Sequence, residues 1–111
     1  MTRDRRFYIS VEVDFFDHPK TMEVGEKVAF RHLKMLAWCH KHRTDGFIPK
    51  DAVGRNLTAA SLAALVRAGL WEVCDGGWCV HDYLKHQQSR ADLERASEAG
   101  KKGAAGRYAN R

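Results

Sequence analysis

Several patterns that would define a membrane or secreted protein are missing from this sequence of 111 residues. No apolar run approaches the ~20 residues that a membrane-spanning helix needs. Residues 1–10 are charged and lack the apolar core of a secretory signal peptide. Cysteine is scarce, and Cys39, Cys74 and Cys79 make an odd number. We therefore expect an intracellular protein with reduced thiols and no membrane attachment.

The usual signatures of catalysis are also missing. There is no glycine-rich phosphate loop, no HExxH pair and no nucleophile elbow. Cys39 and His42 are one helical turn apart, but no third group completes a catalytic set. Asp14, Asp17 and His18 lie close together as nuclease metal ligands do, although a turn with solvated carboxylates explains them more simply. We therefore predict that the protein is not an enzyme and binds no cofactor.

A zinc site is the second metal alternative, because cysteines and histidines cluster in two regions. The residues concerned are Cys39, His40, His42, Cys74, Cys79 and His81. Their spacing lacks the CxxC pairs that are typical of zinc sites. Cys39 also flanks an apolar stripe, where buried thiols are common. We therefore predict no bound metal.

Proline is rare too, and both prolines coincide with predicted boundaries. Residues 8–13 alternate polar and apolar side chains, which predicts a strand with one buried face that ends before Pro19. Residues 25–42 carry a wide apolar arc and predict the central helix of the core. Trp38 falls among the lysines of this helix, so it is either covered by another segment or is an exposed contact residue. Pro49 suits the first position of a short helix that ends near residue 54.

A third helix and a β-hairpin follow. Thr58 is a suitable N-cap for a helix that runs to about Ala68 and stops at Gly69. The stretch "GLWEVCDGGWCVHDY" then predicts strands at 70–74 and 78–82 around a Gly76-Gly77 turn. In that register the facing pairs are Cys74 with Cys79, Glu72 with His81 and Val73 with Val80.

The order of these elements predicts an α+β fold of the winged helix-turn-helix type. Three helices form the core, the hairpin is the wing, and the N-terminal strand completes the sheet. The winged-helix domain covers residues 1–88. Residues 89–111 are predicted as a polar helix, capped by Ser89, and a basic flexible tail, since glycines at 100, 103 and 106 disfavour further helix.

Acidic charge is scarce at the C-terminal end. The whole chain has a net charge of +5, and residues 85–111 carry seven Lys and Arg against three acids. Lys101, Lys102 and Arg107 belong to this basic tail. A basic terminal arm favours a polyanion as partner, although it also suits a merely solvated tail.

Four stretches carry a resemblance to a known group: "FYISVEVDFFDHPKT", "TDGFIPKDAV", "LVRAGLWEVCDGGWCVHDYLKHQQSR" and "KKGAAGRYANR". Together they resemble small phage and prophage proteins, mainly from actinobacterial genomes. They are similar to the N-terminal winged-helix domains of phage replisome organisers and DnaD-type replication proteins. His86 stands where an aromatic residue is usual. The resemblance implies DNA binding in phage replication or transcription regulation, in the cytoplasm of a bacterial host cell.

The predicted DNA-binding residues surround the third helix, which would enter the major groove. Thr58, Ser61 and Arg67 are predicted to point outward from it, a set with little capacity to read bases. Lys50, Arg55 and Asn56 precede the helix, whose N-terminal N–H groups offer a phosphate seat. We therefore expect contacts mainly to the phosphates of double-stranded DNA, and little from the wing, where Asp75 would repel them.

A second hypothesis stays open, because winged helices also serve as protein-interaction modules. In that case the partner is a replisome or host protein and the tail only adds solubility. The poor reading surface of the third helix favours this alternative, whereas the basic tail favours DNA. The N-terminal strand, Trp38 or the tail helix would each be able to form a homodimer contact.

Overall fold

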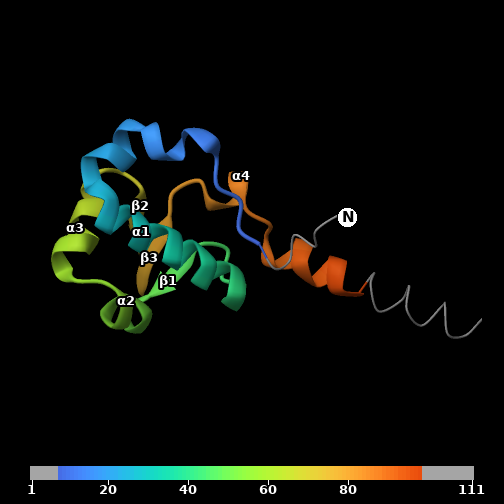
Figure 1. Ribbon diagram of the computed structural model, residues 1–111. Helices are drawn as coiled ribbons and strands as arrows, with labels where there is room; N and C mark the ends of the chain where they lie inside the picture. Colours follow the sequence, from blue (N-terminus) through green and yellow to red (C-terminus); the bar gives the residue numbers. More distant parts are fainter. Residues whose placement is uncertain (1–7, 99–111) are drawn as a thin grey trace, which may run out of the picture.

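The computed structural model describes residues 8–98, which form an α+β fold of helices around one small antiparallel sheet (Figure 1). The helices are the 3-10 helix η2 (Val13–Asp17), α1 (Pro19–His42), α2 (Lys50–Asn56), α3 (Ala59–Arg67), α4 (Tyr83–His86) and a last helical stretch over 90–98. The strands are β1 (Phe47–Pro49), β2 (Trp71–Cys74) and β3 (Gly77–Val80). Within 8–98, no helix has the length and apolar character that crossing a membrane requires.

The central helix α1 starts six residues earlier than the apolar arc predicted. Pro19 occupies a position at the helix start, where its missing N–H costs nothing. The His18 Nδ1 atom caps this end by accepting a hydrogen bond from the Lys20 N–H at 3.2 Å. Gly25 has φ 83° and ψ 168°, so it interrupts the helix between a short first segment and the long one that was predicted.

The sheet has the order β1-β3-β2, and its third strand comes from a different segment than the sequence suggested. The prediction of a strand at 8–13 was wrong: residues 8–12 are irregular and η2 follows. β1 occupies the place beside β3 instead, because the turn after α1 delivers Phe47 directly opposite Cys79. Pro49 belongs to this strand and is the N-cap of α2, not its first helical residue.

The N-terminal segment pairs with a side chain rather than with a strand. The Ser10 N–H donates to Gln87 Oε1 at 2.8 Å, and Gln87 Nε2 donates back to the Ser10 carbonyl at 2.5 Å. One buried amide thus satisfies the two backbone groups that a strand neighbour would have bonded. The alternating pattern predicted an extended backbone here, but it did not identify the partner.

The hairpin turns at Asp75-Gly76, one residue earlier than predicted. Trp71 therefore faces Val80 and Cys74 faces Gly77, so the predicted pairing of Cys74 with Cys79 was wrong. Gly76 supplies the positive φ of 83° that this turn needs. Gly77 is instead needed in the central strand, because a Cβ there would lie 2.2 Å from the Ile48 carbonyl oxygen.

The core lies between α1, α2, α3 and the sheet. Its buried cluster consists of Met35, Leu36, Cys39, Ile48, Ala52, Val53, Leu65, Trp71, Val80 and Tyr83. The indole N–H of Trp71 donates to His32 Nδ1 at 2.9 Å, so a histidine of α1 satisfies the polar atom of the largest core residue. Trp38 is half-buried, with its ring centroid 4.4 Å from that of His42.

The helical stretch over 90–98 begins as predicted at Ser89. The Ser89 hydroxyl accepts from the Asp92 N–H at 3.1 Å, and the Ser89 N–H donates back to the Asp92 carboxylate at 3.4 Å. The Arg90 N–H also donates to Asp45 Oδ1 at 2.6 Å, which attaches the start of this helix to the turn before β1. Lys101, Lys102 and Arg107 of the predicted tail lie outside the described residues.

Candidate nucleic-acid interface

The α2–α3 pair is anchored to the core through one face of each helix. Ala52 and Val53 of α2 and Leu65 of α3 are buried. Leu62 and Val66 are partly buried and pack against the same cluster. The remaining faces of both helices point to solvent, so they are available to a partner.

The N-terminus of α3 is closed by the predicted cap. Thr58 Oγ1 accepts a hydrogen bond from the Ser61 N–H at 3.1 Å, which satisfies one of the free N–H groups of the first turn. The Thr58 hydroxyl also donates to Ser61 Oγ at 2.9 Å. Thr58 itself is exposed, but its hydroxyl is engaged in capping. The backbone N–H groups of Ala59 and Ala60, which have no intrahelical acceptor, stay at the exposed end.

Ser61 does not point outward, and this part of the prediction was wrong. Its exposure is 7%, because it lies one turn before Leu65 on the face of α3 that packs against α1. Arg67 is exposed, but it lies in the last turn, away from the N-terminal end of the helix. The outward surface of α3 therefore carries even fewer base-reading groups than the sequence indicated.

Arg31 of α1 reaches the same site, and sequence reasoning missed it. Its guanidinium Nη1 donates to Ser61 Oγ at 3.4 Å, so the side chain crosses from α1 to the first turn of α3. A cation at this position reinforces the partial positive charge of the helix N-terminus. Arg31 and Ser61 are separated by 30 residues along the chain, so no local sequence pattern predicts their contact.

Two cations of α2, the helix that precedes α3, are exposed. Lys50 starts α2 and Arg55 lies in its last turn. Asn56, in contrast, is half-buried and donates from Nδ2 to the Ala52 carbonyl at 2.7 Å. One of its two amide N–H donors is therefore used within the helix, which reduces what it can offer to a phosphate.

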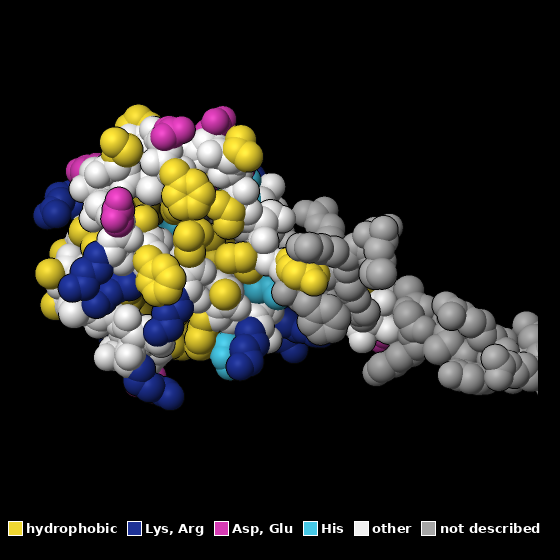
Figure 2. Space-filling view, in the orientation of Figure 1, with side chains coloured by type: hydrophobic (Ala, Val, Ile, Leu, Met, Phe, Trp, Pro, Cys, Tyr) yellow, Lys and Arg dark blue, Asp and Glu magenta, His cyan; other side chains and the backbone are white. Residues whose placement is uncertain are grey.

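The charges on the surface are unevenly distributed, as Figure 2 shows. Lys and Arg side chains gather over the lower part of the view, where α1 and α2 lie, and Asp and Glu gather along its upper edge over η2 and the first segment of α1. Hydrophobic side chains fill the space between the two groups. The exposed cations of α1 and α2 include Lys27, Lys34, Lys41, Lys50 and Arg55.

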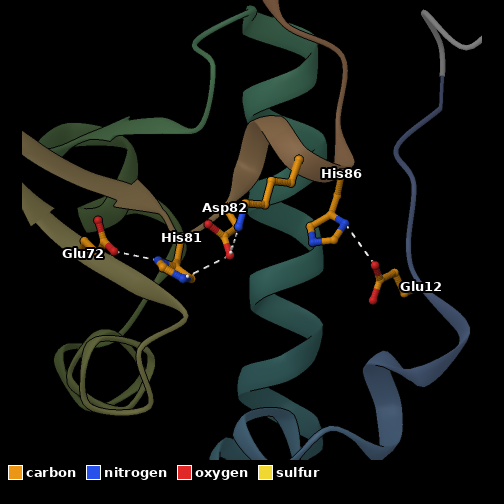
Figure 3. Close-up of polar contacts among 6 residues, drawn as sticks. Glu12, Glu72, His81, Asp82 and His86 are labelled. Atoms are coloured by element: carbon orange, nitrogen blue, oxygen red, sulfur yellow. Dashed lines mark hydrogen bonds and ion pairs between the residues drawn. The ribbon is translucent and has the colours of Figure 1, made fainter.

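On the side of the hairpin turn and α4, histidines pair with carboxylates (Figure 3). His81 lies between Glu72, at 2.6 Å from Nδ1, and Asp82, at 3.2 Å from Nε2. Glu72 and His81 therefore meet, although they are not partners in the hairpin register. His86 lies 3.2 Å from the Glu12 carboxylate and thus connects α4 with the N-terminal segment. With Asp75 exposed at the hairpin turn, this side is unfavourable for a polyanion.

The metal alternatives gain no support from the geometry. Among residues 8–98 there is no group of three or more His, Cys, Asp and Glu side chains arranged to hold a metal ion. Cys39 is buried, and burial raises the pKa of its thiol to about 11. Its Sγ lies 3.9 Å from the Phe47 carbonyl oxygen, so the protonated thiol is a donor within the core.

Comparison with protein-family models, with curated proteins and with solved structures gave no match for this chain. The resemblance to phage winged-helix proteins therefore stays a prediction from the sequence.

Proposed function

We propose that this fold is a winged helix-turn-helix and that the protein binds double-stranded DNA mainly through its phosphates. The order α1-β1-α2-α3-β2-β3 supports the fold assignment, since a helix-turn-helix pair precedes a hairpin that packs on the same core. The resemblance noted in the sequence suggests a role in phage replication or regulation.

The observation that supports the proposal is the contact of Arg31 with the first turn of α3, together with two exposed cations on α2. Arg31 reaches this turn from α1, and Lys50 and Arg55 are exposed on the helix that precedes it. A helix N-terminus with a cation at its first turn favours an anion, and the phosphates of duplex DNA present anions in a regular row. The sparse outward face of α3 argues for weak discrimination between base sequences.

The test measures the affinity of the full chain for a random-sequence duplex by fluorescence anisotropy at a series of salt concentrations. Log affinity should fall linearly with log salt, with a slope of about −0.9 for each phosphate neutralised. The double variant Lys50→Gln/Arg55→Gln should flatten this slope by about 1.8, and Arg31→Gln by up to about 0.9. Affinity should fall to a similar extent for all duplex sequences, because phosphate contacts carry no sequence information.

Lys85→Gln is the matched control, because Lys85 is exposed on α4, on the other side of the molecule from α2 (Figure 1). It removes one positive charge, as Arg31→Gln does, and should leave the slope nearly unchanged. Equal effects for each charge removed, in Lys85→Gln and in the α2 double variant, would mean that net charge alone drives binding. No binding by the intact chain at low salt would reject the proposal and favour the protein-interaction alternative.

Deleting residues 99–111 separates the contribution of the tail from that of the helices. Lys101, Lys102 and Arg107 add to the electrostatic attraction in our proposal, so the deletion should weaken binding without abolishing the effect of Arg55→Gln. Complete loss of binding on deletion would assign the contact to the tail alone. A protected footprint at one sequence would instead show that α3 reads bases.

A further inference from the structure

An apolar patch is exposed where η2 meets α1. Its large side chains are Phe30, Met22 and Phe16, which are 69%, 68% and 59% exposed. They border a groove of about 540 Å³ that is also lined by Ala29 and Leu33. Exposed apolar patches with polar rims mark interaction sites on proteins of this size. Figure 2 shows this patch between the acidic upper edge and the basic lower part of the face.

The solvent-facing row of α1 carries opposite charges on the two sides of an aromatic residue. Glu26, Phe30 and Lys34 follow one another at intervals of four residues, and all three are exposed. Such a row is a surface ridge of the helix. Its N-terminal end is acidic, its centre is aromatic and its C-terminal end is basic. Within residues 8–98, neither Glu26 nor Lys34 forms an ion pair.

We propose that this ridge binds the same ridge of a second copy of the chain, in a twofold dimer centred on Phe30. In the commonest class of helix packing, ridges of this kind lie side by side at a crossing angle of about −50°. A twofold axis at Phe30 runs the two ridges in opposite directions. Glu26 of each copy then lies opposite Lys34 of the other, while the two Phe30 rings meet at the centre and enter the apolar grooves.

The charge order selects this partner and this orientation. A parallel arrangement would place Glu26 beside Glu26 and Lys34 beside Lys34, which costs free energy because like charges repel. An unrelated partner would have to supply the complementary order of base, aromatic and acid, which a second copy carries without further assumption. Isologous contacts of this type are the commonest in soluble oligomers.

The experiment measures the dissociation constant of the dimer for the full chain by sedimentation equilibrium at low salt. Glu26→Lys alone and Lys34→Glu alone should each raise the dissociation constant at least about tenfold, since both cross-pairs become repulsive. The double variant Glu26→Lys/Lys34→Glu should return the constant to within about threefold of the wild type, because the charges are exchanged but still complementary. Circular dichroism checks that each variant is folded.

Two control variants make the same kinds of substitution at exposed residues outside the ridge. Asp75→Lys reverses an acid at the hairpin turn and should leave dimerisation unchanged. Phe30→Ser should abolish the dimer, whereas Val73→Ser, at a β2 residue that is 73% exposed, should not. A wild-type chain that is monomeric at all concentrations would overturn the proposal and leave the patch to a different protein. Failure of the double variant to recover dimerisation would overturn the twofold register.

Discussion

His32 makes the stability of this fold sensitive to acid. Its side chain is 5% exposed, and its Nδ1 atom accepts the Trp71 indole hydrogen at 2.9 Å. The ring also stacks on Phe15, with centroids 5.7 Å apart and planes at 15°. Burial in this apolar position lowers the pKa of His32 from 6.5 to about 4. A proton on Nδ1 would remove the acceptor that Trp71 needs, so the folded state requires the neutral ring.

The size and sign of the effect follow from the two pKa values. Between pH 6.5 and 4 the unfolded chain binds a proton at His32 that the folded chain does not, so acid favours unfolding. The contribution of neutral His32 is complete above pH 6.5 and is lost as the pH falls. At about 1.4 kcal/mol for each pKa unit, the loss reaches about 2 kcal/mol at pH 5 and about 3 kcal/mol at pH 4. Since a small domain has about 5–15 kcal/mol of stability in total, this loss is large.

The measurement is urea-induced unfolding at pH 7.5, 6, 5 and 4 for the wild type and for His32→Gln. Glutamine offers Trp71 a carbonyl oxygen but does not titrate, so it keeps an acceptor and removes the charge change. The variant will have a lower stability at neutral pH, because its shape differs from that of imidazole. The difference between the two proteins should nevertheless shrink by about 3 kcal/mol on going to pH 4. Parallel pH profiles for the two proteins would refute this role of His32.

Two further predictions concern the sheet and the N-terminal segment. Gly77→Ala should destabilise the fold by about 1–3 kcal/mol in urea unfolding, because the new methyl group meets the backbone of β1. Gly54→Ala, at a helical glycine with no atom within 4 Å of the added Cβ, should instead stabilise by about 0.5–1 kcal/mol, and equal losses in both would contradict this reasoning. Gln87→Leu should speed hydrogen exchange of the Ser10 amide while leaving that of Leu65 protected, and unchanged exchange at Ser10 would show that the amide pair does not hold the segment.

The parts of this fold that depend on local chemistry could be read from the sequence. Thr58 caps α3, Gly69 ends it with a positive φ of 80°, and Ser89 caps the last helical stretch, since each signal involves atoms a few residues apart. The hairpin was located but shifted by one residue. Both Asp75-Gly76 and Gly76-Gly77 suit a tight turn, and only the close approach of β1 to Gly77 distinguishes them.

The predictions were wrong where the structure of a segment depends on residues far away in the sequence. An alternating segment such as 8–13 specifies an extended backbone, but whether it joins a sheet depends on what lies beside it, here the amide of Gln87. The candidate site shows the same limit. Arg31 lies beside Ser61 because of the way α1 crosses α3, which no local pattern in the sequence specifies. The burial of Ser61, in contrast, could have been predicted from helical periodicity, because Ser61 shares a face of α3 with the buried Leu65.

The two proposed surfaces use different rows of side chains on α1. Arg31 follows Phe30 directly in the chain and therefore projects about 100° around the helix from it. The side chain that reaches α3 thus turns away from the ridge that would pack on a second copy. A dimer of this kind would leave Lys50 and Arg55 of both chains exposed and double the number of phosphates that one complex can neutralise. Because the salt dependence scales with that number, assembly through α1 would strengthen a contact that each α2–α3 pair makes only weakly.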